Sequence, residues 1–327
     1  MLTFKSAIER INQKIEEELK EVQTKEPAGL YSPIIYTLQR GGKRIRPVLA
    51  LLTYNMYRED LEKVYPAALA IEIFHNFTLL HDDIMDDADI RRGEPTVHKR
   101  FNENAAILSG DAMSILAYQY LGNTPTNNLQ GLLQLFNQTA MEICEGQQYD
   151  MEFEDRSDVT VEEYLTMIKL KTAVLLACSM KAGAMVAEAP AEDAQHLYDF
   201  GINLGLAFQL QDDLLDVYGD ASVFGKKIGG DIIANKKTFL LLNALCLANS
   251  TQKEELERWI NQPAPNREEK VTAVTQLYNE LGVKELSQEK MEDYYEKAIN
   301  HLNQVKLNDQ LKSNLLLIAQ KMMNRDS

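Results

Sequence analysis

The sequence predicts an all-α protein that folds as a single-domain antiparallel helix bundle. Only 9 prolines and 16 glycines interrupt the 327 residues, and no proline occurs in residues 126–189 or 191–262. Long helices are therefore possible in these two stretches. Apolar residues recur at helical spacing, as at Ile8, Ile11 and Ile15, whereas no stretch shows the apolar–polar alternation that is typical of strands.

Helix breakers divide the chain into its expected elements. Gly41 and Gly42, the polar stretch 122–128, Pro190 and the stretch 261–266 each separate two apolar, helix-like segments. We expect helices over residues 4–24, 31–40, 44–57, 61–87, 103–122, 128–150, 160–187, 191–218, 233–249, 252–261, 267–282, 288–304 and 307–324. The links are short, so neighbouring helices should run antiparallel within one domain, residues 1–327.

Composition excludes several classes of function. The chain has 34 Lys and Arg against 49 Asp and Glu, a net charge of −15, and lacks a basic run, so we expect no nucleic acid partner. Residues 112–141 carry no charge, but the loop 122–128 divides them, so we expect no membrane span. Three widely separated cysteines, Cys144, Cys178 and Cys246, are typical of reduced thiols in a cytoplasmic protein.

A short carboxylate motif, DDxxD, occurs twice. Its acidic residues are Asp82, Asp83 and Asp86 in the first copy and Asp212, Asp213 and Asp216 in the second. Residues four apart share one face of a helix, so each copy concentrates negative charge. A solvated acidic face is the alternative, but both copies end apolar helical segments, where unpaired carboxylates are unfavourable unless a cation compensates. Asp is a hard-oxygen ligand, so two facing clusters would hold several Mg²⁺ ions around one diphosphate.

Basic residues accompany both motifs. Residues 41–47 combine a glycine pair with three cations at a helix start, which favours an anion site. Arg91 and Arg92 follow the first motif, and Lys171 interrupts an apolar helix. Lys226 and Lys236 follow the second motif on either side of a Gly-Gly-Asp sequence. Each basic residue has an alternative explanation without function. The helix start can simply be a solvated basic surface, and each lysine can extend its charged end from an apolar helix into solvent.

In combination, these motifs resemble those of one enzyme family. GGKxxRP at 41–47, the two DDxxD motifs, RRG at 91–93, KT at 171–172 and FQxxDD at 208–213 are similar to those of the trans-isoprenyl diphosphate synthases, or polyprenyl synthetases. The resemblance implies an isoprenoid synthase fold, with the helices around a central apolar cavity. It implies Mg²⁺-dependent head-to-tail condensation of isopentenyl diphosphate with an allylic diphosphate (dimethylallyl, geranyl or farnesyl), in a cytoplasmic homodimer.

The resemblance also implies roles for particular residues. The metal ligands would be Asp82, Asp86, Asp212 and Asp216, with three Mg²⁺ ions per active site, and Asp83 and Asp213 would belong to the same catalytic motifs. The isopentenyl diphosphate site would comprise Lys43, Arg46, His75 and Arg92. The allylic diphosphate contacts would be Arg91, Lys171, Thr172, Gln209, Lys226 and Lys236, of which all but Arg91 would also be catalytic. Gln147 and Asp150, in a GQxxD sequence, would support the site. His75 is otherwise a hydrogen-bonded core histidine.

Within the family's mechanism, the allylic diphosphate ionises, oxygens of Thr172 and Gln209 stabilise the cation, and the released diphosphate removes the final proton. Residues before the first motif would line the tunnel for the product. Phe74, Phe77 and Thr78 would limit chain length, and Phe77 followed by the non-aromatic Thr78 resembles geranylgeranyl more than farnesyl diphosphate synthases. Phe74 and Phe77 are otherwise core residues.

Two other functions stay open at this point. A class I terpene cyclase shares the fold and one DDxxD motif, but it lacks GGKxxRP. A non-catalytic partner subunit would be expected to have lost one of the two aspartate motifs, and both are intact here.

Overall fold

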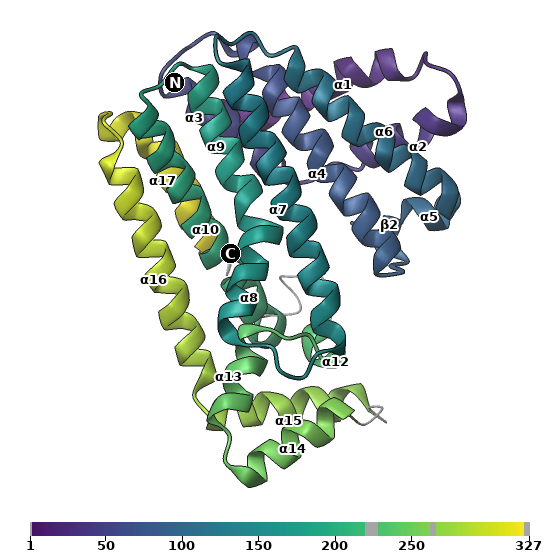
Figure 1. Ribbon diagram of the computed structural model, residues 1–327, viewed down its shortest axis with the longest axis vertical. Coiled ribbons are helices and arrows are strands. Elements are labelled where there is room, and N and C mark those ends of the chain that lie inside the picture. The colour runs from purple at the N-terminus through teal and green to yellow at the C-terminus, as the bar shows by residue number, and fades with distance from the viewer. Residues whose placement is uncertain (1, 220–227, 262–265, 324–327) are drawn as a thin grey trace. The chain divides into compact units, whose positions relative to one another are not determined.

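The computed structural model describes residues 2–219, 228–261 and 266–323 (Figure 1). These residues are mostly helical, with a single short hairpin among them, so the predicted all-α class is confirmed. The chain divides into two compact units, which are described separately. The first comprises residues 1–136, 178–197 and 306–315, and the second comprises residues 137–177, 198–305 and 316–327. A single domain over residues 1–327 stays a prediction.

The first unit contains the N-terminal helices. Their bounds are α1 (Phe4–Val22), α2 (Ala28–Gln39), α3 (Ile45–Asn55), a 3₁₀ turn η1 (Leu61–Lys63), α4 (Tyr65–Met85), α5 (Val97–Arg100) and α6 (Glu103–Gly122). Helices α7 (Leu129–Asp155), α9 (Val174–Val186), α10 (Ala191–Tyr218) and α17 (Asp309–Met323) contribute residues to both units.

Helix α4 forms the core of the first unit. It packs against α6, α3, α2 and α1, and its apolar residues are buried over most of its length. Helix α1 turns one apolar face inward through Ile11, Ile15 and Leu19, which are buried at helical spacing. Thr3 and Ser6 begin α1 with a reciprocal capping box that satisfies its first backbone amides. This packing holds the C-terminal end of α4, where the first aspartate motif lies.

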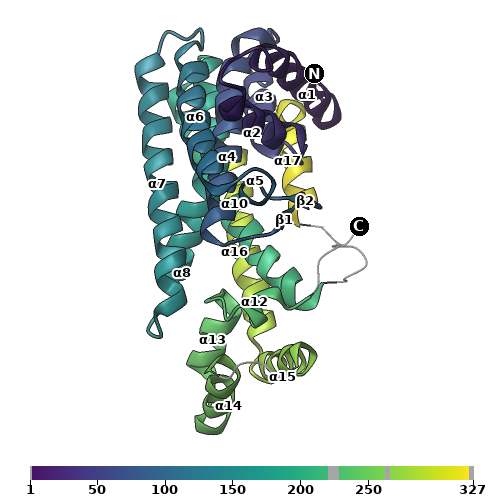
Figure 2. The ribbon, with the colours of Figure 1, turned by 90° about the vertical axis from the view of Figure 1, so that its right-hand side faces the viewer.

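A short hairpin follows α4 (Figure 2). Strand β1 (Ile90–Arg91) pairs with β2 (Glu94–Pro95), and Arg92 and Gly93 form the turn with φ angles of 55° and 80°. Positive φ at both central residues is the geometry of a type I′ turn. The sequence shows no strand pattern here, because strands of two residues are too short for an apolar–polar alternation.

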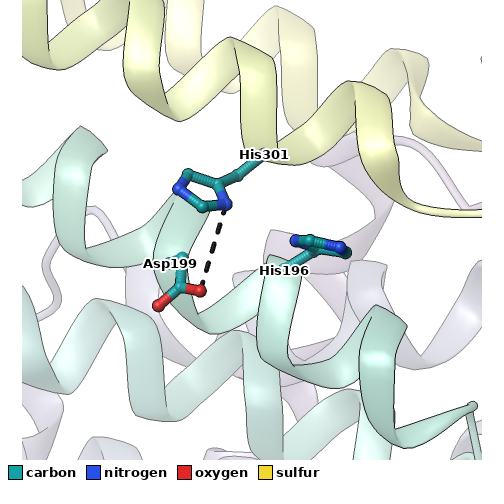
Figure 3. Close-up of side chains that lie close together, drawn as sticks. All are labelled: His196, Asp199 and His301. Carbon is teal, nitrogen blue, oxygen red and sulfur yellow. Dashed lines mark ion pairs between the residues drawn. The ribbon is translucent and has the colours of Figure 1, made fainter.

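The second unit contains the remaining helices. Their bounds are α8 (Val161–Ile168), a π-helical segment η2 (Lys169–Ala173), α12 (Gly230–Ile233), α13 (Phe239–Leu247), α14 (Ser250–Asn261), α15 (Arg267–Glu280) and α16 (Val283–Gln304). Helix α15 packs against α13 and α14 (Figure 2), and buried residues of these helices share a core with Leu214 and Val217 of α10. His301 Nδ1 of α16 lies 3.9 Å from Asp199 Oδ2 of α10 (Figure 3). The core around Leu214 and Val217 holds the part of α10 that carries the second aspartate motif.

Three predicted helices are interrupted. The helix expected over 61–87 begins with the 3₁₀ turn η1 and is α-helical only from Tyr65. The helix expected over 160–187 changes from α to π geometry at 169–173 before it continues as α9. The helix expected over 233–249 is divided into α12 and α13, because Asn235 adopts a left-handed φ of 52° between them. The interruptions at 169–173 and after α12 lie at residues that line a cavity of the second unit.

Candidate active site

The first aspartate motif occupies the end of α4. Asp86 is the C-cap residue and is exposed, and its backbone nitrogen donates to the carbonyl of Asp82. Asp83 is buried, and its Oδ1 accepts a 2.6 Å hydrogen bond from Nε of Arg91. Burial raises the pKa of Asp83, and the charge of Arg91 opposes that rise. The environments of two carboxylates therefore differ: Asp83 is buried and hydrogen-bonded to Arg91, whereas Asp86 is exposed.

The hairpin turn explains the glycine pair at 41–42. Arg92 donates through Nη1 to the carbonyl of Gly41. Gly42 has a φ of 142°, and a β-carbon there would lie 2.9 Å from the guanidinium of Arg92. The sequence predicted an anion-binding role for these glycines. In the structure, Gly42 makes room for the Arg92 side chain, and the carbonyl of Gly41 accepts its hydrogen bond.

Arg46 and His75 form the centre of a basic cluster. Arg46 Nη1 lies 2.9 Å from His75 Nε2. A guanidinium only donates, so Nε2 accepts and the imidazole carries its proton on Nδ1. Burial, together with the charges of Arg46 and Arg92, lowers the pKa of His75 well below its usual range, and burial lowers that of Arg46 to about 10. Lys43 is exposed in the preceding loop.

Arg44, the third cation of the glycine-pair motif, has a structural role. It is buried and forms a 2.5 Å ion pair with Glu72 and a 2.7 Å hydrogen bond to the carbonyl of Leu38. Nδ2 of Asn76 also donates to Glu72 at 3.0 Å. This buried charge is therefore paired inside the unit.

The residues predicted to limit product length lie one to three turns before the first motif. Phe74 is buried, and its ring centroid lies 5.3 Å from that of Phe77 and 5.1 Å from that of Phe136. Phe77 is only partly buried and also packs on His81 at 4.8 Å. Thr78 Oγ1 donates to the carbonyl of His75 at 2.8 Å, so its hydroxyl is satisfied within α4.

A cavity of about 300 Å³ in the second unit brings the later motifs together. The predicted site residues that line it are Lys171, Thr172, Gln209, Asp212, Asp213, Asp216 and Lys236, and Asp150 lines it as well. Lys226 lies outside the described residues. Carboxylates and lysines thus face one polar space, as a bound metal diphosphate would require.

Hydrogen bonds order the wall of this cavity. Thr172 Oγ1 donates to Gln209 Oε1 at 3.3 Å, and Gln209 Nε2 donates to Asp213 Oδ1 at 3.1 Å. Asp213 also accepts from the hydroxyl of the buried Tyr164. The bond from Gln209 Nε2 to Asp213 Oδ1 orients the Gln209 amide and turns Oε1 toward Thr172. Burial raises the pKa of Asp213 to about 8, and hydrogen bonds from Tyr164 and Gln209 oppose this rise.

The π-helical segment sets the positions of Lys171 and Thr172. A single turn of π-helix is frequent at functional sites, because it shifts the side chains that follow. Lys171 Nζ forms a 2.5 Å ion pair with Asp150 of α7, the acidic residue of the predicted GQxxD sequence. Gly146 of the same sequence faces the backbone of Leu170 and Lys171 directly. Gly146 and Asp150 thus contact the segment that carries Lys171, whereas Gln147 is partly buried and is not among the residues that line the cavity. A supporting role for Gln147 and Asp150 stays a prediction.

Sequence reasoning missed some residues of both units. Tyr164 bonds to Asp213, and Asp231 lines the cavity and donates its backbone N–H to Asp216 Oδ2 at 2.9 Å. In the first unit, Arg40 contacts the hairpin. Asp231 had a signal in the Gly-Gly-Asp sequence, and Arg40 directly precedes the glycine pair. Tyr164 had no signal that distinguishes it from a core aromatic residue.

The donor set fits magnesium. Asp86 and Asp212 are exposed, and Asp82 and Asp216 are partly exposed, whereas Asp83 and Asp213 are buried and hydrogen-bonded to protein groups. Hard carboxylate oxygens with open sides suit Mg²⁺, which keeps water and substrate oxygens among its ligands. The first and third carboxylates of each motif would therefore hold the ions, whereas the middle ones are bonded to protein groups.

Comparisons with known proteins agree with these features. A family model described as polyprenyl synthetase matches residues 27–281. The chain is 43% identical over 247 residues to the short chain isoprenyl diphosphate synthase of Methanocaldococcus jannaschii, covering 75% of each chain. It is 38% identical over 301 residues to the geranylgeranyl pyrophosphate synthase of Geoglobus acetivorans, covering 91% of each. A crystal structure of a geranylgeranyl pyrophosphate synthase matches with a TM-score of 0.90 and 43% identity, covering 98% of this chain and 99% of that one.

Proposed function

Because the chain belongs to the polyprenyl synthetase family, we propose that it condenses isopentenyl diphosphate head to tail with an allylic diphosphate and releases diphosphate. It is a trans-prenyltransferase that makes short-chain prenyl diphosphates. The observation that supports this most directly is the cavity where Lys171 and Lys236 face the carboxylates of the second motif.

Isopentenyl diphosphate would bind in the basic cluster of the first unit. Lys43, Arg46 and Arg92 supply positive charge for the diphosphate, and Arg46 and Arg92 offer planar, multidentate donors. His75 carries its proton on Nδ1 because Arg46 occupies Nε2, so Nδ1 is the one ring atom that donates. The role of His75 is then to bind substrate as a neutral donor.

The allylic diphosphate would bind through Arg91, Lys171, Lys226 and Lys236. Mg²⁺, held by Asp82, Asp86, Asp212 and Asp216 with three ions per active site, would withdraw charge from the leaving diphosphate when bound. Gln209 Oε1 and Thr172 Oγ1 lie 3.3 Å apart on the cavity wall, and their dipoles would stabilise developing positive charge. Asp213 keeps Gln209 in the orientation that this requires. The released diphosphate accepts the last proton, so a side-chain base is not needed.

The product would be geranylgeranyl diphosphate. Phe77 is bulky and partly buried, and it contacts the buried Phe74, one turn earlier in α4. An α-helix rises about 5.4 Å per turn, so such a pair would stop a growing chain after a few isoprene units. Thr78 is small, and its hydroxyl bonds to the carbonyl of His75 in the same helix. Phe77 would therefore be the residue that determines product length.

One product assay tests the proposal. The purified chain is incubated with Mg²⁺, isopentenyl diphosphate and dimethylallyl, geranyl or farnesyl diphosphate, and diphosphate release and product length are measured. We expect release only when both substrates and Mg²⁺ are present, with a 20-carbon product. Release without isopentenyl diphosphate, giving a cyclic hydrocarbon, would indicate a terpene cyclase. The absence of release with every primer would indicate a non-catalytic partner subunit.

Two further properties belong to the proposal. A homodimer is supported by an apolar face on α6, where Ile107, Leu108 and Ile115 are 41%, 60% and 61% exposed. L108E should yield monomers in sedimentation velocity, whereas L247E, at a similarly exposed single leucine, should not. A dimeric L108E protein would contradict this interface.

A cytoplasmic location is the second property. It is supported by Cys144, Cys178 and Cys246, all of which are described and which no disulfide joins. Among the described residues, no helix is both long enough and apolar enough for a membrane span. Cell fractionation with an antibody against the chain would test the location.

A further inference from the structure

The hairpin of the first unit carries two arginines with different partners. Arg91 donates to Asp83 at 2.6 Å and lies 3.3 Å from Asp82, whereas Arg92 donates to the carbonyl of Gly41. If the proposed function is correct, Arg91 serves the allylic diphosphate and Arg92 serves isopentenyl diphosphate. A single structural element therefore positions donors for both substrates.

This hairpin cannot hold its own shape. Its strands have two residues each, and isolated two-stranded hairpins are marginal even when they are longer. Arg92 also has a φ of 55°, a conformation that costs free energy for a residue other than glycine. The position of both guanidiniums must therefore depend on contacts from outside the hairpin.

Arg40, the C-cap residue of α2, provides such contacts. One nitrogen of its guanidinium, Nη2, donates to the carbonyl of Arg91 and, at 2.7 Å, to that of Glu94. Arg91 and Glu94 are the paired residues on either side of the turn, so Arg40 joins the two strands at its base. Charged donors form stronger hydrogen bonds than neutral ones.

Tyr36, one turn earlier in α2, holds Arg40 and the hairpin together. The guanidinium carbon of Arg40 lies 4.9 Å from the centroid of the Tyr36 ring, and that of Arg100 lies 4.7 Å from it. Tyr36 Oη donates to the carbonyl of Pro95 at 2.7 Å. Stacking on an aromatic face limits the freedom of the Arg40 side chain. Helix α2 thus clamps the hairpin at Arg91, Glu94 and Pro95.

We propose that Arg40, held by Tyr36, is a positioning residue that sets the place of Arg91 and Arg92 together and so controls the binding of both diphosphate substrates. Arg40 acts through the backbone of the hairpin. This distinguishes it from Arg91 and Arg92, each of which would affect one substrate.

Steady-state kinetics with each substrate varied in turn test this inference. Loss of a charge-assisted hydrogen bond corresponds to about tenfold in binding, so R40Q should raise both KM values about tenfold and change kcat little. R91Q should raise KM mainly for the allylic substrate, and R92Q mainly for isopentenyl diphosphate. R40K, which keeps the charge, should recover part of the loss, and Y36F should raise both KM values less than R40Q.

Arg58 offers a matched control. It also donates to a backbone carbonyl, that of Ala187 at 3.1 Å, and pairs with Glu188. R58Q should leave both KM values unchanged. A rise in only one KM for R40Q would mean direct substrate contact, and a rise in neither would mean no role; both results overturn the inference. If R40Q does not fold, R40K and Y36F decide by the same two KM values. A wild-type protein without product would instead overturn the proposed function.

Discussion

Gly146 of α7 lies directly against the backbone of Lys171. A β-carbon at 146 would overlap the Lys171 nitrogen and lie 2.8 Å from the carbonyl carbon of Leu170. Backbone atoms cannot move aside as a flexible side chain can. The glycine therefore permits the close approach of α7 to the π-helical segment that carries Lys171 and Thr172.

We expect G146A to displace the π-helical segment. Overpacking of this kind costs about 1–3 kcal/mol of stability, and misplacement of catalytic groups by about 1 Å reduces kcat by about 100-fold. Chemical denaturation and product formation measure the two effects. G29A is the control, because Gly29 has an open side within α2. Wild-type activity in G146A would show that the contact is not required.

D86N should weaken magnesium binding. Asp86 is exposed at the end of α4, and an amide is a much poorer ligand than a carboxylate for Mg²⁺. We expect the Mg²⁺ concentration for half-maximal activity to rise about tenfold or more and kcat to fall, because loss of even a residue that only supports a metal ligand typically costs about 10–100-fold. D87N removes the neighbouring exposed carboxylate, which pairs with Lys99, and should leave both values unchanged. Equal Mg²⁺ dependence in both variants would contradict Asp86 as a ligand.

F77A should lengthen the product. Removal of the partly exposed ring opens space in front of Phe74, so at least one more isoprene unit should be added before release. Chromatography of the dephosphorylated products measures the change. F77Y keeps the ring and should give the wild-type length. Products of unchanged length from F77A would place the end of the tunnel elsewhere.

His75 should make stability depend on pH. Its pKa in the folded state is lowered, so the unfolded chain binds more protons as pH falls below the ordinary value of about 6.5. This contribution is therefore complete above about pH 6.5 and is lost at lower pH, by up to about 1.4 kcal/mol per pH unit. The stability difference between wild type and H75N, measured by urea unfolding, should shrink from pH 7 to pH 5. A constant difference would mean that His75 becomes protonated as easily as in the unfolded chain.

The helices were predictable because their limits are set locally. Residues 103–122 and 191–218 are helical as predicted, since the loop 122–128 and Pro190 separate apolar segments whatever lies around them. The site residues were predictable as a set because their motifs are unusual in combination. Family membership is confirmed by the comparisons, whereas the roles of individual residues stay predictions.

The remaining features depend on contacts between distant residues. The π-helical segment at 169–173 lies against Gly146, which is 25 residues before Lys171. The bond from Tyr164 to Asp213 joins α8 to α10, and the contact of Arg40 with Glu94 joins α2 to a hairpin too short for a pattern. Composition and periodicity describe one segment of the chain at a time, so they do not predict which distant residues contact each other.

The left-handed backbone of Arg92 has a consequence for directed evolution. Glycine and asparagine adopt that conformation at lower free energy than arginine, so either would relax the turn. A library of variants selected for heat resistance alone would accumulate such replacements. The selected variants would then lack the guanidinium of Arg92, which contacts Gly41. Durable variants of this chain must therefore be sought with turnover as part of the selection.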